Sequence, residues 1–133
     1  MKALIEKLTQ IPGPPGYEKQ IRDAVRAEIE PYADEIRVDA LGNLIARKGE
    51  TPGKGLRIML AAHLDEIGVI ATHIDESGFI RFTNIGGVMR RYVPGGRVRF
   101  LDGTPGVIGT EKITNSYRVP ALNKMYIDVG ASS

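Results

Sequence analysis

The feature that most constrains the fold of this chain is an apolar run near its middle. Residues 58–62 read Ile-Met-Leu-Ala-Ala, and the apolar character reaches back to Leu56 with Arg57 as the one charged residue. A continuous run of this kind is typical of a β-strand buried on both faces, because a half-buried strand would alternate apolar and polar residues. Such a strand needs neighbouring strands and a covering layer on each side. The run therefore predicts a strand over residues 56–62 within a layered α/β domain.

A histidine and an aspartate follow directly at the end of this run. His63 and Asp65 are two residues apart, and residues i and i+2 of a strand point to the same face. Imidazole is a common ligand of zinc-like metals, and a carboxylate beside it can either bind the metal or orient the ring. The spacing alone leaves a packed core histidine as an open alternative. We therefore treat His63 and Asp65 as candidates for one corner of a metal site.

Two helices and a hairpin are expected before the apolar run. Apolar residues recur at helical spacing over residues 2–10, and a stretch rich in proline and glycine over residues 11–16 must then interrupt the helix. Over residues 17–30 the apolar positions again follow a 3.6-residue period, which predicts a second helix. Residues 35–39 and 44–47 flank a glycine-containing turn, as in a β-hairpin.

Beyond residue 68 the sequence changes to closely spaced β-strands. Residues 68–74 and 79–82 flank the turn sequence Asp-Glu-Ser-Gly, and short apolar segments follow at 97–100, 106–109 and 125–129. Short strands separated by glycine-containing turns are typical of a small β-barrel. The sequence therefore predicts an α/β region followed by a β-rich region.

The composition describes a folded globular chain. Hydrophobic residues make up 42% of it and charged residues 26%, which excludes an intrinsically disordered chain. No apolar stretch approaches the ~20 residues of a membrane-spanning helix, so we expect no membrane partner. The absence of cysteine excludes thiol catalysis and cysteine-based zinc sites, and it favours a cytoplasmic location.

Basic residues are concentrated in the second part of the chain. Residues 81–133 contain 8 Lys and Arg against 3 Asp and Glu, although the net charge of the whole chain is only +2. These arginines are not interleaved with aromatic residues on which nucleic-acid bases could stack. We therefore expect no nucleic-acid partner, and we interpret the basic residues as a solvated sheet surface or a subunit contact.

Several short motifs resemble, in the same order, those of one family. They are Ile-Pro-Gly-Pro-Pro-Gly-Tyr-Glu at 11–18, Asp-Ala-Leu-Gly-Asn-Leu at 39–44, Ala-His-Leu-Asp-Glu-Ile-Gly at 62–68, Asn-Ile-Gly-Gly-Val at 84–88 and Ile-Asp-Val-Gly-Ala at 127–131. The family is that of the tetrahedral, or glutamyl-type, dinuclear-metal aminopeptidases, some of whose members are labelled endoglucanases or cellulases. The resemblance covers essentially the whole chain, but only the N-terminal portion of a family member. Pro15 stands where the family often has serine, and it stiffens the loop.

This resemblance implies a fold and a division into domains. Residues 1–68 would form the N-terminal part of the catalytic α/β domain, which is a partial αβα sandwich like that of the zinc peptidases. Residues 69–133 would form an inserted small β-barrel that mediates dimerisation and is incomplete at its C-terminal end. Dimers of the family build a twelve-subunit assembly. The implied partners are therefore peptide substrates and further copies of the chain.

The resemblance also implies an activity, which is the removal of N-terminal residues from peptides by water activated between two divalent metal ions, zinc or cobalt. His63 would bind one metal, and Asp65 would contribute to the catalytic site by holding the imidazole ring in place. The family's bridging aspartate, general-base glutamate and remaining ligands come later than the residues matched here. We therefore expect this chain alone to bind metal weakly or partially and to be inactive.

Other readings of the residues and of the function remain open. Glu66 lies beside the motif, but on a strand its side chain faces away from His63 and Asp65, so a role as general base would need a bend in the strand. His73 is expected to be structural, and Asp128 to serve a turn or an interface. The chain could instead be a non-catalytic assembly module. A glycoside hydrolase ranks last, because it needs two opposed carboxylic acids that nothing in the sequence singles out.

Overall fold

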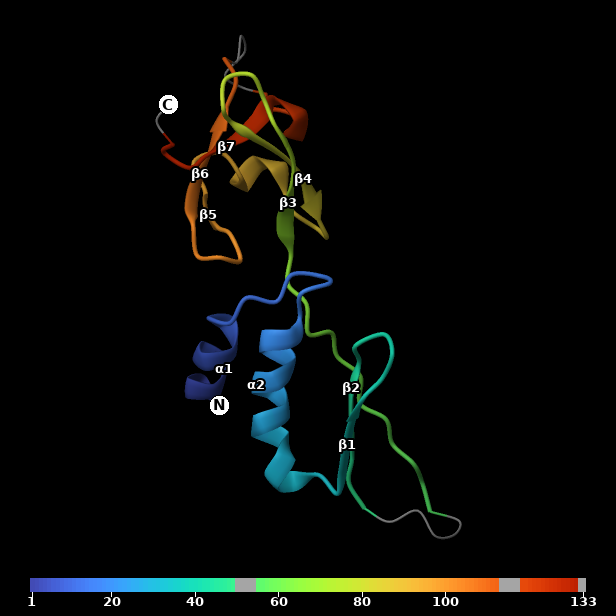
Figure 1. Cartoon of the computed structure of the whole chain (residues 1–133). Coiled ribbons are helices and arrows are strands. Elements are labelled where there is room, and N and C mark those ends of the chain that lie inside the picture. The colour runs from blue at the N-terminus through green and yellow to red at the C-terminus, as the bar shows by residue number, and fades with distance from the viewer. Residues whose placement is uncertain (50–54, 113–117, 132–133) are drawn as a thin grey trace. The chain divides into compact units, whose positions relative to one another are not determined.

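The structure, a computed structural model, describes residues 1–49, 55–112 and 118–131 (Figure 1). It divides into two compact units, Met1–Glu66 and Ile67–Ser133, which we refer to as unit 1 and unit 2. Unit 1 contains two helices and a hairpin, and unit 2 is built mainly of antiparallel strands. The chain is thus a mixed α/β protein, as its sequence predicts.

Unit 1 begins with two helices separated by the loop of prolines and glycines. Helix α1 spans Lys2–Thr9 and helix α2 spans Lys19–Ile29, so both predicted helices are confirmed, and a 3₁₀ turn, η1 (Glu30–Tyr32), follows α2. The apolar face of α2 turns Ile21 inward, where the residue is only 7% exposed. Ile21 is the one buried hydrophobic residue of unit 1 among those the structure describes, so the core of this unit is small.

The predicted hairpin is also confirmed. Strands β1 (Glu35–Val38) and β2 (Leu44–Arg47) pair antiparallel. Asp39 closes the turn, since its Oδ1 accepts the backbone N–H of Asn43 at 2.9 Å and its Oδ2 accepts the Asn43 side chain at 2.8 Å. These hydrogen bonds hold the pKa of Asp39 below its ordinary value, and the one from the Asn43 side chain has the largest effect. Gly42 has φ +88°, a conformation that strains any residue with a Cβ. The Asp-x-x-Gly-Asn motif is therefore the hairpin turn itself.

The buried strand predicted over residues 56–62 is wrong for this structure. Residues 55–67 have no regular secondary structure, and Leu56, Ile58, Met59 and Leu60 are 97%, 84%, 88% and 93% exposed. A strand buried on both faces needs paired neighbours and covering layers. Within residues 1–49 and 55–66, β1 and β2 are the strands, and they pair with each other. The apolar run is thus left in contact with solvent.

Unit 2 contains a five-stranded antiparallel sheet in the order β3-β4-β7-β6-β5. Its strands are β3 (Gly68–Ile74), β4 (Ile80–Ile85), β5 (Arg97–Arg99), β6 (Pro105–Thr110) and β7 (Met125–Asp128), with 3₁₀ turns η2 (Arg90–Tyr92) and η3 (Leu122–Lys124) between them. The strands predicted from the sequence for residues 68–129 are all present. The pair of β4 with β7 has one residue in register, Ile80 opposite Ile127, whereas the other pairs are longer.

The sheet of unit 2 curls around a hydrophobic core. Its buried members are Phe82, Val93, Ile108, Met125 and Ile127. Met125 and Ile127, both on β7, are 0% and 1% exposed. Gly106 lies against this core, and a Cβ built on it would come within 2.5 Å of Ile127 Cγ2. The strand β6 therefore approaches β7 too closely for a side chain at residue 106.

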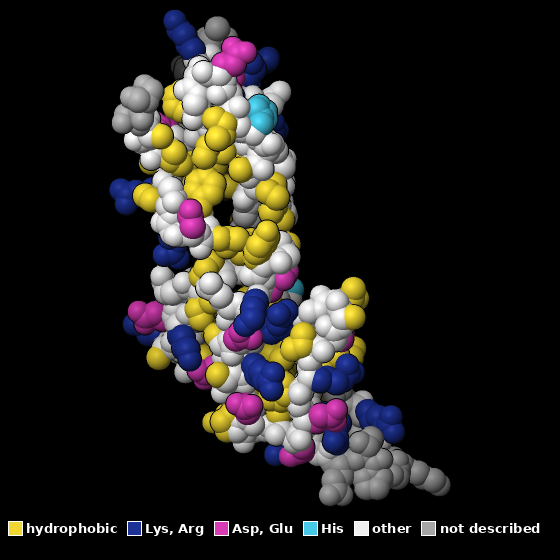
Figure 2. Space-filling model, in the orientation of Figure 1, with side chains coloured by type: hydrophobic (Ala, Val, Ile, Leu, Met, Phe, Trp, Pro, Cys, Tyr) yellow, Lys and Arg dark blue, Asp and Glu magenta, His cyan; other side chains and the backbone are white. Residues whose placement is uncertain are grey.

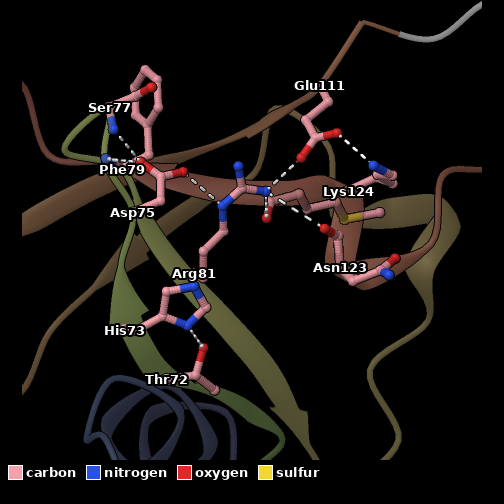
Figure 3. Close-up of polar contacts among 10 residues, drawn as sticks. Thr72, His73, Asp75, Ser77, Phe79, Arg81, Glu111, Asn123 and Lys124 are labelled. Carbon is pink, nitrogen blue, oxygen red and sulfur yellow. Dashed lines mark hydrogen bonds and ion pairs between the residues drawn. The ribbon is translucent and has the colours of Figure 1, made fainter.

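A cluster of ion pairs connects four segments of unit 2 (Figure 3). The Arg81 guanidinium, on β4, donates to Asp75 Oδ2 and to Glu111 Oε1, each at 2.8 Å, and Lys124 Nζ lies 2.8 Å from Glu111 Oε2. Asp75 also accepts the backbone N–H groups of the β3–β4 turn. Only 21% of the Arg81 side chain and 18% of the Asp75 side chain are exposed, so this pair is shielded better than ordinary surface ion pairs.

These contacts shift the protonation equilibria of the cluster. Burial opposes ionisation of Asp75, but the hydrogen bonds from Arg81 and from the turn amides outweigh it and hold the pKa of Asp75 below its ordinary 3.8. Lys124 and then Arg81 lower the pKa of Glu111 in the same way, and Asp75 and Glu111 raise the pKa of Arg81. Asp75, Glu111 and Arg81 are therefore charged at neutral pH.

Hydrophobic side chains also reach the surface, where they are interspersed with charged ones (Figure 2). On β3, an edge strand of the unit 2 sheet, Ile70 and Ile74 are 49% and 69% exposed. Across residues 1–49, 55–112 and 118–131, no helix has the length and apolar composition that a membrane crossing requires.

Candidate functional site

The structure brings His63 and Asp65 together. Nδ1 of the His63 imidazole lies 2.9 Å from the backbone oxygen of Asp65 and 3.3 Å from its carboxylate Oδ1. Both of these atoms are acceptors, so they favour the tautomer that carries its proton on Nδ1. The other ring nitrogen, Nε2, then has its lone pair available, and 84% of the His63 side chain is exposed. The pair thus has the arrangement in which a carboxylate orients a metal-binding imidazole.

An irregular segment, rather than a strand, creates this arrangement. Residues 62–66 lie outside the strands, so the expected alternation of side chains does not apply to them. The segment is instead held by the Pro/Gly loop, because Glu66 N–H donates to the Gly13 carbonyl at 3.0 Å and Gly13 N–H donates to Glu66 Oε1 at 3.1 Å. The sequence pattern did not indicate this contact, which joins residues 53 positions apart.

The residues present fit one corner of a metal site and not a whole one. Among the residues that the structure describes, no group of three or more His, Cys, Asp or Glu side chains lies close enough together to hold a metal ion. Stable zinc sites use three or four protein ligands. His63 can supply one ligand and Asp65 its orienting carboxylate. Further ligands have to come from elsewhere.

The remaining candidates from the sequence make other contacts. His73 is on β3, is exposed, and has its Nδ1 3.2 Å from the Thr72 hydroxyl. Asp128 accepts the backbone N–H of Gly130 at 2.8 Å, which is the turn role expected of it. The Oε1 atom of Glu66 accepts the backbone N–H of Gly13 at 3.1 Å. The sequence interpretation missed the ion-pair cluster around Arg81, because nothing in the spacing of its members links them.

Comparison with known proteins places the fold and the motifs in one class. The chain superposes on aminopeptidase APDkam598 from the archaeon Desulfurococcus kamchatkensis with a TM-score of 0.85 at 40% identity. The superposed region is 98% of this chain and 37% of that aminopeptidase. The chain superposes on the TET1 peptidase of Pyrococcus horikoshii with a TM-score of 0.83 at 37% identity, covering 99% and 41%. That peptidase can assemble into a tetrahedron or a large octahedral shell. The fold is therefore that of the TET aminopeptidases.

The sequence comparisons give the family. The family model of the M42 glutamyl aminopeptidases matches residues 42–133. A provisionally named aminopeptidase of Acetivibrio thermocellus is 49% identical over 130 residues, which are 98% of this chain and 38% of that protein. This chain belongs to the M42 glutamyl aminopeptidase family. It spans well under half the length of the relatives it matches, and some of its solved neighbours carry the name endoglucanase.

Proposed function

We propose that this chain is the N-terminal portion of an M42 metallo-aminopeptidase, an enzyme that removes N-terminal residues from peptides. The observation that carries the proposal is the geometry of His63 and Asp65 in a chain of this family. The imidazole turns Nδ1 to Asp65, and 84% of the His63 side chain is exposed. An imidazole oriented in this way by a carboxylate is suited to binding a divalent metal.

Each of the two residues has a separate task in this proposal. His63 binds one of two divalent metal ions through Nε2, and Asp65 fixes the ring without touching the reacting atoms. Zinc and cobalt both suit a set of imidazole and carboxylate ligands. Bound metal would supply an activated water for hydrolysis. The residues described here complete neither metal site, so we propose that the 133-residue chain is inactive by itself.

The proposal extends to the domain architecture, the oligomeric partner and the cellular location. Unit 1 would be part of an αβα sandwich, and its exposed apolar run supports this, since residues 56–62 have the composition of a central strand. The curled sheet of unit 2 would form a small barrel that mediates dimerisation. The exposed isoleucines of the β3 edge support a homo-oligomeric partner, and the cysteine-free sequence supports a cytoplasmic location.

The metal-binding part of the proposal can be tested with Co²⁺ and nuclear magnetic resonance. Titration of the chain with Co²⁺ should broaden the imidazole signals of His63 before those of His73. His63→Ala should abolish that binding, whereas the matched variant His73→Ala should leave it intact. Broadening that is confined to His73, or equal at both histidines, would contradict the assignment of His63 as the ligand.

The catalytic part of the proposal is tested by hydrolysis of an aminoacyl chromogenic substrate. We expect no turnover by the 133-residue chain with added Zn²⁺ or Co²⁺. Turnover that His63→Ala abolishes would show that these residues form a complete active site, and it would overturn the proposal that this chain supplies only a portion of one.

A second function, as a non-catalytic assembly module, is favoured by the exposed β3 edge. It predicts stable oligomers in light scattering together with no His63-dependent binding of Co²⁺. The two proposals therefore differ in the outcome of the same titration.

A further inference from the structure

We propose that Glu66 is a positioning residue that holds the His63–Asp65 pair in place by fastening its segment to Gly13. Glu66 would act through a hydrogen bond to the backbone and would neither bind metal nor move a proton. The inference concerns the same site as the proposed function, and its relevance to metal binding rests on that function. The positioning itself can be tested without metal.

Glu66 and Gly13 are joined by two reciprocal hydrogen bonds. The backbone N–H of Glu66 donates to the Gly13 carbonyl at 3.0 Å, and the Glu66 carboxylate accepts the Gly13 N–H at 3.1 Å. Gly13 is buried, so its N–H would lack a partner without this carboxylate. A hydrogen bond to a charged group is among the stronger ones in proteins, and an unsatisfied buried donor is costly. Glu66 is therefore held at both its backbone and its side chain.

The packing around Gly13 makes this contact a tight one. A Cβ built on Gly13 would lie 2.6 Å from Ile21 Cγ2 on α2 and 3.7 Å from the carbonyl oxygen of Leu64. Gly13 is thus enclosed between helix α2 and the segment that bears His63. The absence of a side chain at residue 13 is what allows the loop to approach both.

This contact matters because the other end of the segment is unsupported. Residues 55–62 are exposed and belong to no strand, so they cannot fix the position of His63. Glu66 directly follows Asp65, and its two hydrogen bonds anchor the C-terminal side of the segment. Within the described part of unit 1, Glu66 therefore restrains the backbone next to Asp65, whose carboxylate and carbonyl oxygens contact the imidazole.

The need for a negative charge separates this role from direct chemistry. A general base or a metal ligand acts through the charge of its carboxylate. A positioning residue needs only an acceptor oxygen at the right distance from Gly13. Glutamine supplies that oxygen without the charge, and alanine supplies neither. The variants Glu66→Gln and Glu66→Ala therefore distinguish the two roles.

The experiment compares these variants in the full 133-residue chain by nuclear magnetic resonance at a pH where imidazole is neutral. The first readout is hydrogen exchange of the Gly13 amide, and the second is the pair of ¹⁵N shifts of the His63 ring, which report its tautomer. Glu18→Ala is the matched control, because Glu18 accepts the Gly16 N–H at 2.7 Å in the same loop without touching the His63 segment. The amide signals of α2 show in each variant that unit 1 still folds.

We expect Glu66→Ala to speed Gly13 exchange about tenfold and to move His63 toward a mixture of tautomers. Glu66→Gln should resemble the native chain in both readouts, and Glu18→Ala should change neither. The proposal is overturned if Glu66→Gln behaves like Glu66→Ala, if Glu66→Ala changes neither readout, or if Glu18→Ala has the same effect.

A Co²⁺ titration then separates this inference from the proposed function. If His63 binds Co²⁺, Glu66→Ala should weaken its affinity about tenfold, as expected for the loss of an outer support, and Glu66→Gln should restore it. If His63 of the native chain binds no Co²⁺ while the exchange and tautomer results hold, the proposed metal site fails and the positioning role stands.

Discussion

Replacing Gly106 with alanine should destabilise unit 2 by a measurable amount. The added Cβ would lie 2.5 Å from Ile127 Cγ2 and 3.1 Å from Val98 Cγ2, whereas carbon atoms in good contact are about 3.5–4.0 Å apart. Ile127 is 1% exposed and cannot move aside into solvent. Overpacking of this kind costs about 1–3 kcal/mol. That is a large share of the roughly 3–10 kcal/mol expected for a unit of this length.

Urea denaturation followed by far-ultraviolet circular dichroism measures this loss. With a denaturant slope of about 1 kcal/mol per molar urea, a loss of about 2 kcal/mol would lower the midpoint by about 2 M. Gly87→Ala is the matched control, because Gly87 is exposed, has no positive φ, and has nothing within 4 Å of its Cβ position. Its midpoint should stay at the native value.

A double-mutant cycle tests whether the clash with Ile127 is the cause. Ile127→Ala removes the obstructing methyl group and should by itself cost about 2–5 kcal/mol. In the double variant the Cβ of residue 106 enters the space left behind, so the two losses should sum to more than the measured loss. A native midpoint for Gly106→Ala, or strictly additive losses, would refute the reasoning.

Three further predictions concern the ion-pair cluster, the apolar run and the hairpin. Asp75 and Glu111 have lowered pKa values, so the stability they provide is complete above their ordinary pKa values of 3.8 and 4.5 and is lost as the pH falls through their lower folded values. Arg81→Met should therefore make acid unfolding of unit 2 less steep, as read by circular dichroism between pH 6 and pH 2; an unchanged profile would exclude the cluster as the cause. Leu60→Lys should reduce self-association in light scattering without lowering the urea midpoint, because Leu60 is 93% exposed. Gly42→Ala should cost about 1 kcal/mol in the same denaturation assay because of its positive φ, and a neutral result would contradict that.

Local patterns predicted the elements that form from local contacts. The helices α1 and α2 follow from apolar periodicity and from the prolines that separate them. The hairpin β1–β2 and the strands of unit 2 follow from alternation and from glycine turns. The partners that these helices and strands pack against or pair with are residues of this chain.

The apolar run over residues 56–62 shows where this reasoning stops. Its apolar composition indicates a strand that is buried on both faces. That burial, however, depends on strands and layers that other residues must provide. The irregular segment at residues 63–66 shows the same limit at the site. His63 and Asp65 were found by their chemical types, whereas the contact of Glu66 with Gly13 depends on a tertiary approach that no spacing encodes.

The pairing pattern of unit 2 has a consequence for how the unit folds. The pairs β3–β4, β5–β6 and β6–β7 join strands that follow one another in the chain, so each closes a shorter loop than β4–β7 does. The pair β4–β7 joins distant strands through Ile80 and Ile127, and it must close a loop that contains β5 and β6. Because loop-closure entropy opposes such contacts, we expect the hairpins to form first and β7 to dock against β4 last.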